Sequence, residues 1–334
     1  MAHPNPVAAV GGEHFLPYDA RTGGESIVYF TRDLSAEGLL NIYRRLEPVL
    51  QGKVAVKLHT GEPNGPNIIP RPWVKMLLDA ELPEAVIVET NTYYAGDRYT
   101  TEQHRETLRI NGWTFAPVDI MDEEGAEPLP FKGGKWFDEM YVGTHLKHYD
   151  SLLVLTHFKG HTSGGFGGSN KNIGIGCADG RIGKAMIHTA AGSDNPMSIK
   201  NEEFMERMTE STKSVTDFFG DRILYINVLR NMSVDCDCFG VNAAPVVTPN
   251  VGIVASLDIL AIDQACVDMI YAMEEGDRHA MVERMESRHA LRQLTYMKEL
   301  GMGNDRYRLI DIDNDDAVIT AADAVEGVLP FNTL

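Results

Sequence analysis

Cysteine and positive charge are both scarce in this sequence. The chain has four cysteines among 334 residues, too few for a scaffold held together by disulfides. It carries 30 Lys and Arg residues against 48 Asp and Glu residues, a formal net charge of −18. A chain this acidic repels phosphate backbones and anionic lipid headgroups, so we expect neither a nucleic acid nor a membrane as its partner.

Long apolar runs are absent as well. No stretch approaches the roughly 18 apolar residues that cross a bilayer. The first residues lack the basic and apolar regions of a secretory signal peptide, so we expect none. The composition, 43% hydrophobic and 23% charged, is typical of a globular protein with enough apolar material for a core. We therefore expect an acidic, soluble, cytoplasmic protein.

Extended and helical segments alternate along most of the chain. Residues 1–25 are rich in Pro and Gly without periodicity, which predicts an irregular N-terminal segment, either frayed or wrapped over the body. The segments with extended character are 53–58, 84–90, 113–118, 151–157, 222–229, 251–256 and 307–312, and those with helical character are 71–81, 101–111, 200–219, 260–274 and 280–300, with a further helix behind Ser35. The alternation predicts an α/β fold with a mostly parallel sheet flanked by helices. Residues 26–334 form one domain or two α/β lobes with the site between them, and no boundary is fixed by the sequence.

Polar residues gather where the predicted strands end. The five groups are Lys57 with His59, Glu89 to Thr92, Thr156 with His157, Asn227 with Arg230, and Ser256 with Asp258. In open α/β sheets the ligand crevice lies beyond the carboxyl ends of the strands, so these groups predict a site there. The alternative is that each loop is polar only because it meets water.

The strongest local signal is the glycine-rich stretch 156–184, THFKGHTSGGFGGSNKNIGIGCADGRIGK, which holds nine glycines. Tight turns explain two or three of them. Glycine lets backbone N–H groups approach an anion closely, and Lys159, Lys171, Arg181 and Lys184 add positive charge. We therefore predict that a small anionic metabolite binds here. The predicted ligand-binding residues are Lys57, Glu62, Asn64, Asn91, Gly165, Gly167, Gly168 and Lys184.

The common nucleotide motifs do not fit this stretch. A phosphate-binding Walker loop needs glycine where Ala178 stands and Ser or Thr where Ala185 stands. The run from Gly165 to Gly168 lacks the third glycine of a dinucleotide fingerprint, and we expect no helix to open after it. ATP and NAD in their usual cradles are therefore disfavoured.

Histidines flank the same stretch. His157 and His161 are four residues apart, but the glycines around them favour a loop over a helix. Histidines next to a glycine-rich loop are suited to general acid–base catalysis or to metal binding. The predicted catalytic residues are His161, His157, His59 and Lys171.

The cysteines offer a metal site as an alternative. Cys236 and Cys238 are separated by one residue, too few for a zinc knuckle and unlike the runs that hold iron–sulfur clusters. They form a Cys/His metal site only if the fold brings Cys177 and His188 to them. Cys266 lies in an apolar run and is predicted to be simply buried.

Several long motifs resemble the family catalogued as domain of unknown function 362, often labelled "uncharacterised iron–sulfur centre protein". They are VAVKLHTGEPNGPNIIPRPWV (54–74), VETNTYYAGDRYTTEQH (88–104), THFKGHTSGGFGGSNKNIGIGC (156–177), DCDCFGVNAAPVVTPNVGIVASLDILAIDQACVDMI (235–270) and ELGMGNDRYRLIDI (299–312). Many members carry a ferredoxin-like insert with two C-x-x-C-x-x-C runs. Here AAGSDNPMSIKNEEFMERM, which has no cysteine, takes its place. The iron–sulfur label implied by the resemblance therefore does not transfer to this chain.

A shorter stretch, from His161 to Lys171, resembles one in the nickel-pincer lactate racemases. The spacing of ten residues between His and Lys is shared, whereas the glycines are arranged differently. The resemblance implies that His161 is an acid–base group and that Lys171 holds a cofactor or a carboxylate.

Three functions remain open at this point. The favoured one is an enzyme, an isomerase, lyase or oxidoreductase, that acts on a small anionic metabolite with help from a metal or cofactor. The alternative is an accessory or electron-transfer protein with iron, nickel or an iron–sulfur cluster on Cys177, Cys236 and Cys238. The third is a module that binds a ligand without chemistry. With any of these three functions the chain could act as a homo-oligomer.

Overall fold

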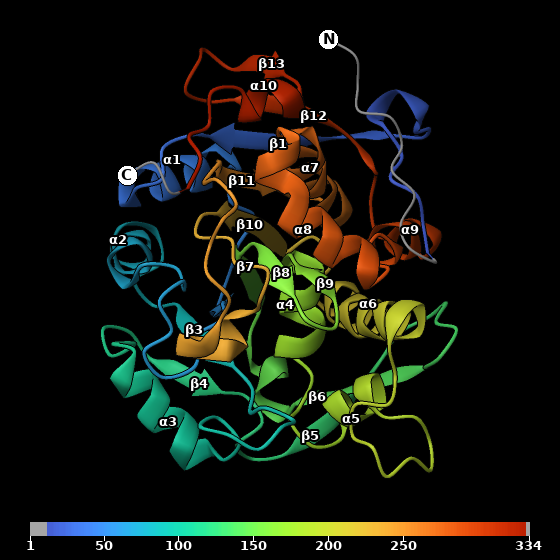
Figure 1. The fold of residues 1–334 in the computed structure, drawn as a ribbon. Coiled ribbons are helices and arrows are strands. Elements are labelled where there is room, and N and C mark those ends of the chain that lie inside the picture. The colour runs from blue at the N-terminus through green and yellow to red at the C-terminus, as the bar shows by residue number, and fades with distance from the viewer. Residues whose placement is uncertain (1–11, 332–334) are drawn as a thin grey trace.

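The computed structural model describes residues 12–331, and Figure 1 shows its ribbon. In this part of the chain nine strands form one sheet and four more form two hairpins. In chain order the strands are β1 (Glu25–Thr31), β2 (Val54–Lys57), β3 (Val86–Glu89), β4 (Val118–Ile120), β5 (Ala126–Pro130), β6 (Glu139–Gly143), β7 (Ser151–His157), β8 (Lys159–His161), β9 (Gly165–Gly167), β10 (Ile223–Leu229), β11 (Gly252–Ser256), β12 (Arg306–Asp311) and β13 (Ala317–Ile319).

The helices surround this sheet. They are α1 (Ala36–Arg45), α2 (Arg71–Glu81), α3 (Thr101–Ile110), α4 (Ser169–Gly176), α5 (Gly183–His188), α6 (Asn201–Phe219), α7 (Ile259–Ala272), α8 (Glu275–Ser287), α9 (Arg292–Glu299) and α10 (Ala321–Val325), with 3₁₀ turns η1 (Tyr18–Ala20), η2 (Thr144–His148) and η3 (Asp237–Asn242). Within residues 12–331 no helix has the length and apolarity that a membrane crossing requires.

The main sheet has the strand order β13-β12-β1-β11-β10-β7-β2-β3-β4. Its pairs are parallel except for those of β11 with β1 and β10 and that of β13 with β12. Seven of the nine strands therefore run in one direction, and the prediction of a mostly parallel α/β sheet is confirmed.

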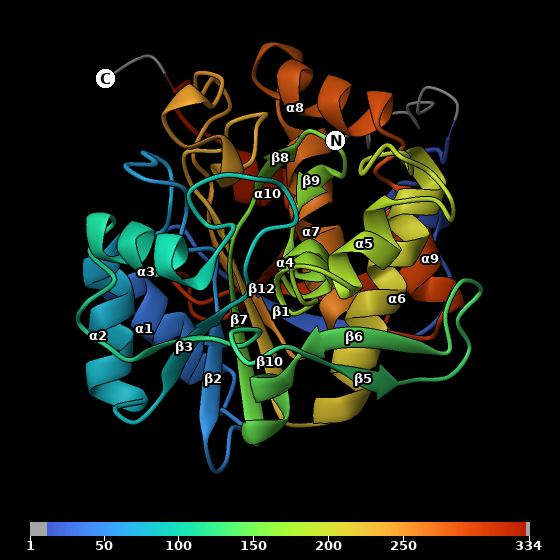
Figure 2. The ribbon, with the colours of Figure 1, turned by 90° about the horizontal axis from the view of Figure 1, so that it is seen from below.

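Both faces of the sheet are covered by helices. Along β7 the side chains alternate: Leu152 and Val154 belong to one core, and Leu153 and Leu155 to the other. Figure 2 shows α1, α2 and α3 on one side of the sheet and α4, α5 and α6 on the other. A strand buried on both faces needs a continuous apolar run, which is why β7 could be recognised from its sequence.

One of the five predicted strand ends lies at the opposite end of the sheet from the other four. Strand β11 runs antiparallel to β10, so that Ser256 lies opposite Tyr225, in the first half of β10. The carboxyl end of β11 therefore lies where the parallel strands begin, at the end of the sheet opposite to their carboxyl ends. There Asp258 accepts a hydrogen bond from Ser26 instead.

The predicted N-terminal segment is described from residue 12 onward, and residues 1–11 lie outside the described part. Phe15 stacks face to face on Tyr271 of α7 with ring centroids 4.1 Å apart. The Arg21 guanidinium donates to both carboxylate oxygens of Asp268, also on α7, at 2.5 and 2.6 Å. These contacts fasten residues 15–21 to α7.

The largest departure from the sequence prediction is α4, which opens at Ser169 where we expected no helix. Its first turn is held by the buried Asp263 of α7. The backbone N–H groups of Ser169 and Asn170 donate to the two carboxylate oxygens of Asp263 at 2.8 and 2.9 Å. This helix is buried around most of its circumference and carries two glycines, so it has no amphipathic pattern to recognise.

Gly168 permits this close approach, because a Cβ atom there would lie 2.4 Å from Oδ1 of Asp263. We expect Gly168→Ala to lower the free energy of unfolding by about 1–3 kcal/mol, the usual cost of overpacking. The matched control is Gly167→Ala, whose Cβ would have no neighbour closer than 3.7 Å. Chemical denaturation of both variants measures the difference. Equal losses in the two variants would contradict the role given to Asp263.

Candidate functional site

A pocket of about 340 Å³ lies beyond the carboxyl ends of β2 and β3, beside α4 and α5. Five cationic side chains line it: Lys57, Arg98, Lys159, Lys171 and Lys184. Three histidines also line it: His59, His161 and His188. Because β2 and β3 are parallel, their carboxyl ends bring Lys57, His59 and Glu89 to the same edge of the sheet. The glycine-rich stretch supplies further lining residues from β8, α4 and α5.

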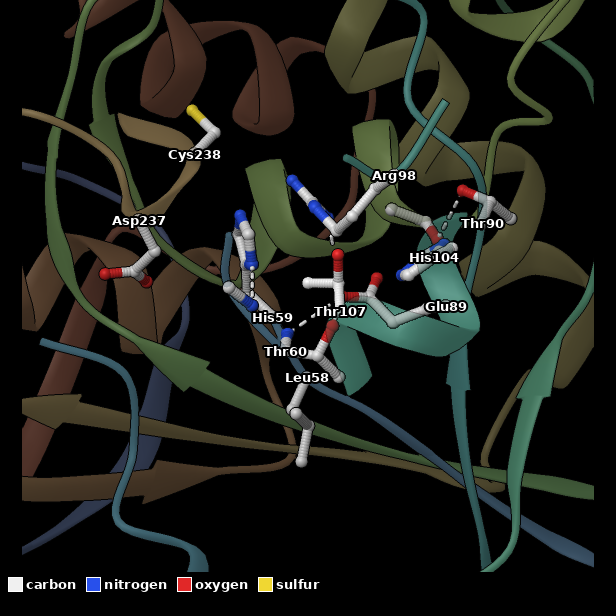
Figure 3. A network of polar contacts seen from close by, with 12 residues as sticks. Leu58, His59, Thr60, Glu89, Thr90, Arg98, His104, Thr107, Asp237 and Cys238 are labelled. Carbon is white, nitrogen blue, oxygen red and sulfur yellow. Dashed lines mark hydrogen bonds and ion pairs between the residues drawn. The ribbon is translucent and has the colours of Figure 1, made fainter. Parts of the chain in front are cut away.

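Three of the five cations already have an acidic partner. Lys57 donates to Glu89 at 2.7 Å, Lys159 lies 3.1 Å from Asp237, and Arg98 donates to Glu62 at 2.8 Å. Figure 3 shows Glu89 and Arg98 near His59 and Thr60. Thr60 donates to Glu89 through both its backbone N–H and its hydroxyl.

Two of these acids, Glu89 and Asp237, are held in the ionised form. Burial alone would raise the pKa of Glu89, but Lys57 and neighbouring cations hold that pKa well below its usual range. Burial likewise opposes ionisation of Asp237, and His157 and Lys159 hold its pKa well below the ordinary value.

The other two cations, Lys171 and Lys184, have no carboxylate within ion-pair distance among the described residues. The Lys184 ammonium donates to the hydroxyl of Thr90 at 2.6 Å and to the carbonyl of Asn91. That of Lys171 faces the sulfur of Cys236 at 3.7 Å. Both side chains are more than nine-tenths buried. Burial lowers the pKa of Lys184 to about 8.

Cys236 and Cys238 meet His161 beside Lys171. A ring nitrogen of His161 and the two sulfurs lie within 4.8 Å of one another. The backbone N–H of Cys238 also approaches the Cys236 sulfur, at 3.4 Å. A hydrogen bond from the Cys238 thiol, with Lys171 and His161, lowers the pKa of Cys236 well below its ordinary value, and the pKa of Cys238 is raised in turn. The pair therefore holds one proton, and Cys236 is the thiolate.

Two of the three pocket histidines, His161 and His59, share one protonation pattern. The backbone N–H of Gly164 donates to Nδ1 of His161 at 2.8 Å, and that of Gly61 donates to Nδ1 of His59 at 2.9 Å. Burial and a nearby cation lower the pKa of each ring, which keeps it neutral. A neutral imidazole that accepts at Nδ1 carries its proton at Nε2. Nε2 of His59 lies 4.0 Å from the Cys236 sulfur, so this N–H faces the thiolate.

His157, a predicted catalytic residue, does not line the pocket. Its Nδ1 lies 2.9 Å from a carboxylate oxygen of Asp237, and its Nε2 lies 2.6 Å from the carbonyl of Arg230. Both ring nitrogens are thus engaged with protein groups. The structure places His157 as a support for Asp237, the residue between the two cysteines.

The predicted ligand-binding glycines have other uses. Gly168 admits Asp263, as described above. Gly165 has a φ of +73°, and a Cβ there would lie 2.3 Å from Cβ of Ala290. A Cβ atom at Gly167 would lie no closer than 3.7 Å to its nearest neighbours, Lys159 and Lys171. The N–H groups that open α4 are taken by Asp263, so they are not free for an external anion.

Three more predicted residues do not line the pocket. Glu62 is the partner of Arg98 and also accepts from the Tyr94 hydroxyl at 2.7 Å. Asn64 has a φ of +59°, and its N–H donates to Asn111. Asn91 offers its carbonyl to Lys184, so it reaches the site through the backbone.

The predicted metal ligands are only partly brought together. Cys236 and Cys238 are adjacent, but Cys177 is fully buried in the main core and does not line the pocket. Burial raises the pKa of Cys177 to about 12. His188 lines the pocket, but its Nδ1 bonds to the carbonyl of Lys184. Cys266 is buried, as predicted.

An iron–sulfur cluster therefore does not fit this pocket. Such clusters are usually held by four cysteines, and the described residues bring two to the site. The donor set of Cys236, Cys238 and His161 instead suits a single thiophilic ion such as Zn²⁺. The His161 tautomer opposes it, because a metal-binding histidine normally donates from its other nitrogen, whereas Nδ1 of His161 accepts.

The sequence prediction missed Arg98 and the apolar part of the lining. Arg98 lies in the polar loop after β3, where nothing marked it out. Tyr93, Tyr94, Met197 and Phe239 also line the pocket. The tyrosine pair directly after a polar strand end was the available signal.

Comparisons with known proteins give a family and two distant structural likenesses. A family model described as "Domain of unknown function (DUF362)" matches residues 54–268. No curated protein matches the chain. A lactate racemase apoprotein from Thermoanaerobacterium thermosaccharolyticum has a TM-score of 0.39 at 12% identity, covering 94% of this chain and 91% of that one. A structural-genomics target from Thermotoga maritima has a TM-score of 0.38 at 15% identity, covering 59% and 51%.

The contrast between paired and unpaired lysines can be tested by stability. Lys57→Met leaves the buried Glu89 without its main partner, and we expect it to cost about 3 kcal/mol of unfolding free energy. Lys184→Met removes a buried charge that no carboxylate compensates, and we expect a change within about 1 kcal/mol. Urea denaturation of the two variants decides. A loss for Lys184→Met as large as that for Lys57→Met would show that Lys184 has a structural role.

Proposed function

The chain belongs to the family described as domain of unknown function (DUF362), and from this premise we propose that it is an enzyme that binds a small organic anion and moves a proton on it. The family description names no activity, so the proposal is supported by the pocket itself.

One observation carries the proposal. Lys171 and Lys184 are buried at the pocket without a carboxylate partner among the described residues. A buried ammonium group is costly unless an anion compensates it. In a chain with a net charge of −18, acids to pair with them were plentiful. An anion from solution supplies the missing partner of Lys184 and gives Lys171 a second partner beside the Cys236 sulfur.

The remaining groups suit proton transfer next to a carboxylate. Such a transfer places negative charge on the carboxylate oxygens, and cationic or N–H donors stabilise it. Lys171, Lys184 and the Nε2–H of His161 are the donors in this proposal. Cys236, the thiolate, and Cys238, which lines the pocket, take up and return the proton. The reaction class is isomerisation or elimination.

Anion binding should depend on both lysines and on pH. The probes are acetate, succinate, phenylacetate and inorganic phosphate, measured by calorimetry. We expect saturable binding of at least one, weakened tenfold or more in Lys171→Met and Lys184→Met. Lys184 is an ammonium below a pKa of about 8, so affinity should be highest below pH 8 and fall above it in wild type. The fall should be smaller in Lys184→Met.

The matched control is Lys75→Met, an exposed lysine paired with Asp79, which removes the same charge from the surface. It should leave binding unchanged. Exchange of the α-hydrogens of the bound carboxylate in D₂O, followed by NMR, then tests the chemistry, and Cys236→Ser should abolish it without abolishing binding. If none of the four anions binds, the proposal is wrong.

The cysteine pair favours a second candidate, a protein that binds a thiophilic metal ion at Cys236, Cys238 and His161. Because Nδ1 of His161 accepts a hydrogen bond and the pKa of Cys238 is raised, metal binding at Nε2 and at both sulfurs must release protons. With Zn²⁺ as probe, we expect this function to show stoichiometric binding that Cys236→Ser and Cys238→Ser abolish. Cys177→Ala, which alters a cysteine outside the pocket, should leave it intact. Binding that is equal in all three variants would exclude this site.

A further inference from the structure

Large apolar side chains are exposed at the wall of the same pocket. Tyr94 is 37% exposed, and Met197 and Phe239 are each 39% exposed. They come from three separate parts of the chain: the loop after β3, the loop between α5 and α6, and η3. Other exposed apolar residues, such as Val318 and Leu257, lie elsewhere. Three independent segments thus bring exposed apolar surface to one concave site.

The tyrosines turn their polar ends into the protein. The Tyr94 hydroxyl donates to Glu62 at 2.7 Å and accepts from Arg98 at 3.0 Å. The Tyr93 hydroxyl bonds to that of Thr189 at 2.7 Å. With the hydroxyls satisfied, the carbon faces of the rings are what these residues offer to a ligand.

This wall has a chemistry different from that of Lys171 and Lys184, the two lysines without a carboxylate partner. Lys171 and Lys184 are buried cations that an anionic group stabilises. The exposed apolar surfaces of Tyr94, Met197 and Phe239 instead contribute favourable free energy when a ligand removes them from water. A ligand that satisfies both must carry its charge at one end and an apolar group at the other. The flat ring of Phe239 and the polarisable thioether of Met197 favour an aromatic group.

We infer that the substrate is a monocarboxylate bearing an aromatic ring, with the carboxylate at Lys171 and Lys184 and the ring against Tyr94, Met197 and Phe239. This inference rests on the proposed anion site. A pocket of about 340 Å³ is at the small end of ligand sites, which suits a metabolite of this size. Sugar phosphates and short dicarboxylates leave the apolar wall in water.

The test compares phenylacetate with acetate and succinate by calorimetry. Burial of the ring should make phenylacetate bind about tenfold or more tightly than acetate. Phe239→Ala and Met197→Ala should each weaken phenylacetate several-fold and leave acetate unchanged. Val241→Ala is the matched control, because Val241 lies two residues after Phe239 in η3, is 66% exposed and does not line the pocket. It should change neither affinity.

The outcomes separate the two proposals. If succinate or acetate binds in a lysine-dependent way as tightly as phenylacetate, the aromatic substrate is excluded and the anion site stands. The same conclusion follows if Phe239→Ala and Met197→Ala leave phenylacetate binding unchanged. If no carboxylate binds wild-type protein, the anion site itself is wrong, and this inference falls with it.

Discussion

The carboxylate of Asp263 fixes the site more than any other single group. It accepts from the first two N–H groups of α4 and from the side-chain amide of Asn227 at 2.8 Å, and so ties α7, α4 and β10 together. Burial raises its pKa to about 6, although the N–H donors oppose this. Burying this carboxylate costs free energy, but its hydrogen bonds fix the start of α4, and α4 places Lys171 at the pocket. The carboxylate occupies the position at a helix N-terminus where nucleotide-binding proteins hold a phosphate.

The cationic side chains at the pocket differ in whether a carboxylate pairs with them. At the pocket Glu89, Asp237 and Glu62 each form an ion pair with a cationic side chain. Each of these pairs also helps to position a loop. The pairs fix the walls, so they are poor candidates for ligand binding even though their lysines line the pocket. In the proposed site the anion is therefore recognised by Lys171 and Lys184, which have no carboxylate partner among the described residues. Residue type alone therefore does not identify the ligand-binding lysines, because Lys57 and Lys184 have the same chemistry but different partners.

The sequence allowed the sheet to be predicted because its buried strands are continuous apolar runs, as in β7 and β10. It did not allow β11 to be oriented, since the direction of a strand depends on its neighbours. It also concealed α4, β8 and β9, which are short and glycine-rich; β8 and β9 are fully buried and α4 is mostly buried, so that no periodic pattern arises. Within the site, His161 and Lys171 could be singled out by their loop. The role of His157 depends on Asp237, 80 residues away, and no local pattern reports such a contact.

The glycines near the histidines show why a motif can be noticed for the wrong reason. Glycine-rich loops suggested a cradle for an external anion, yet the N–H groups of Gly61 and Gly164 point at Nδ1 of the neighbouring histidines. Each contact fixes the proton of its ring at Nε2, next to the thiolate of Cys236. These histidines can then donate a hydrogen bond but offer no free lone pair, so neither is available as a base. In the proposed reaction the base is therefore a group that is anionic in the resting site. Among the described residues at this wall, the acids are held by cations, which leaves the Cys236 thiolate, with Cys238 as its link to the pocket.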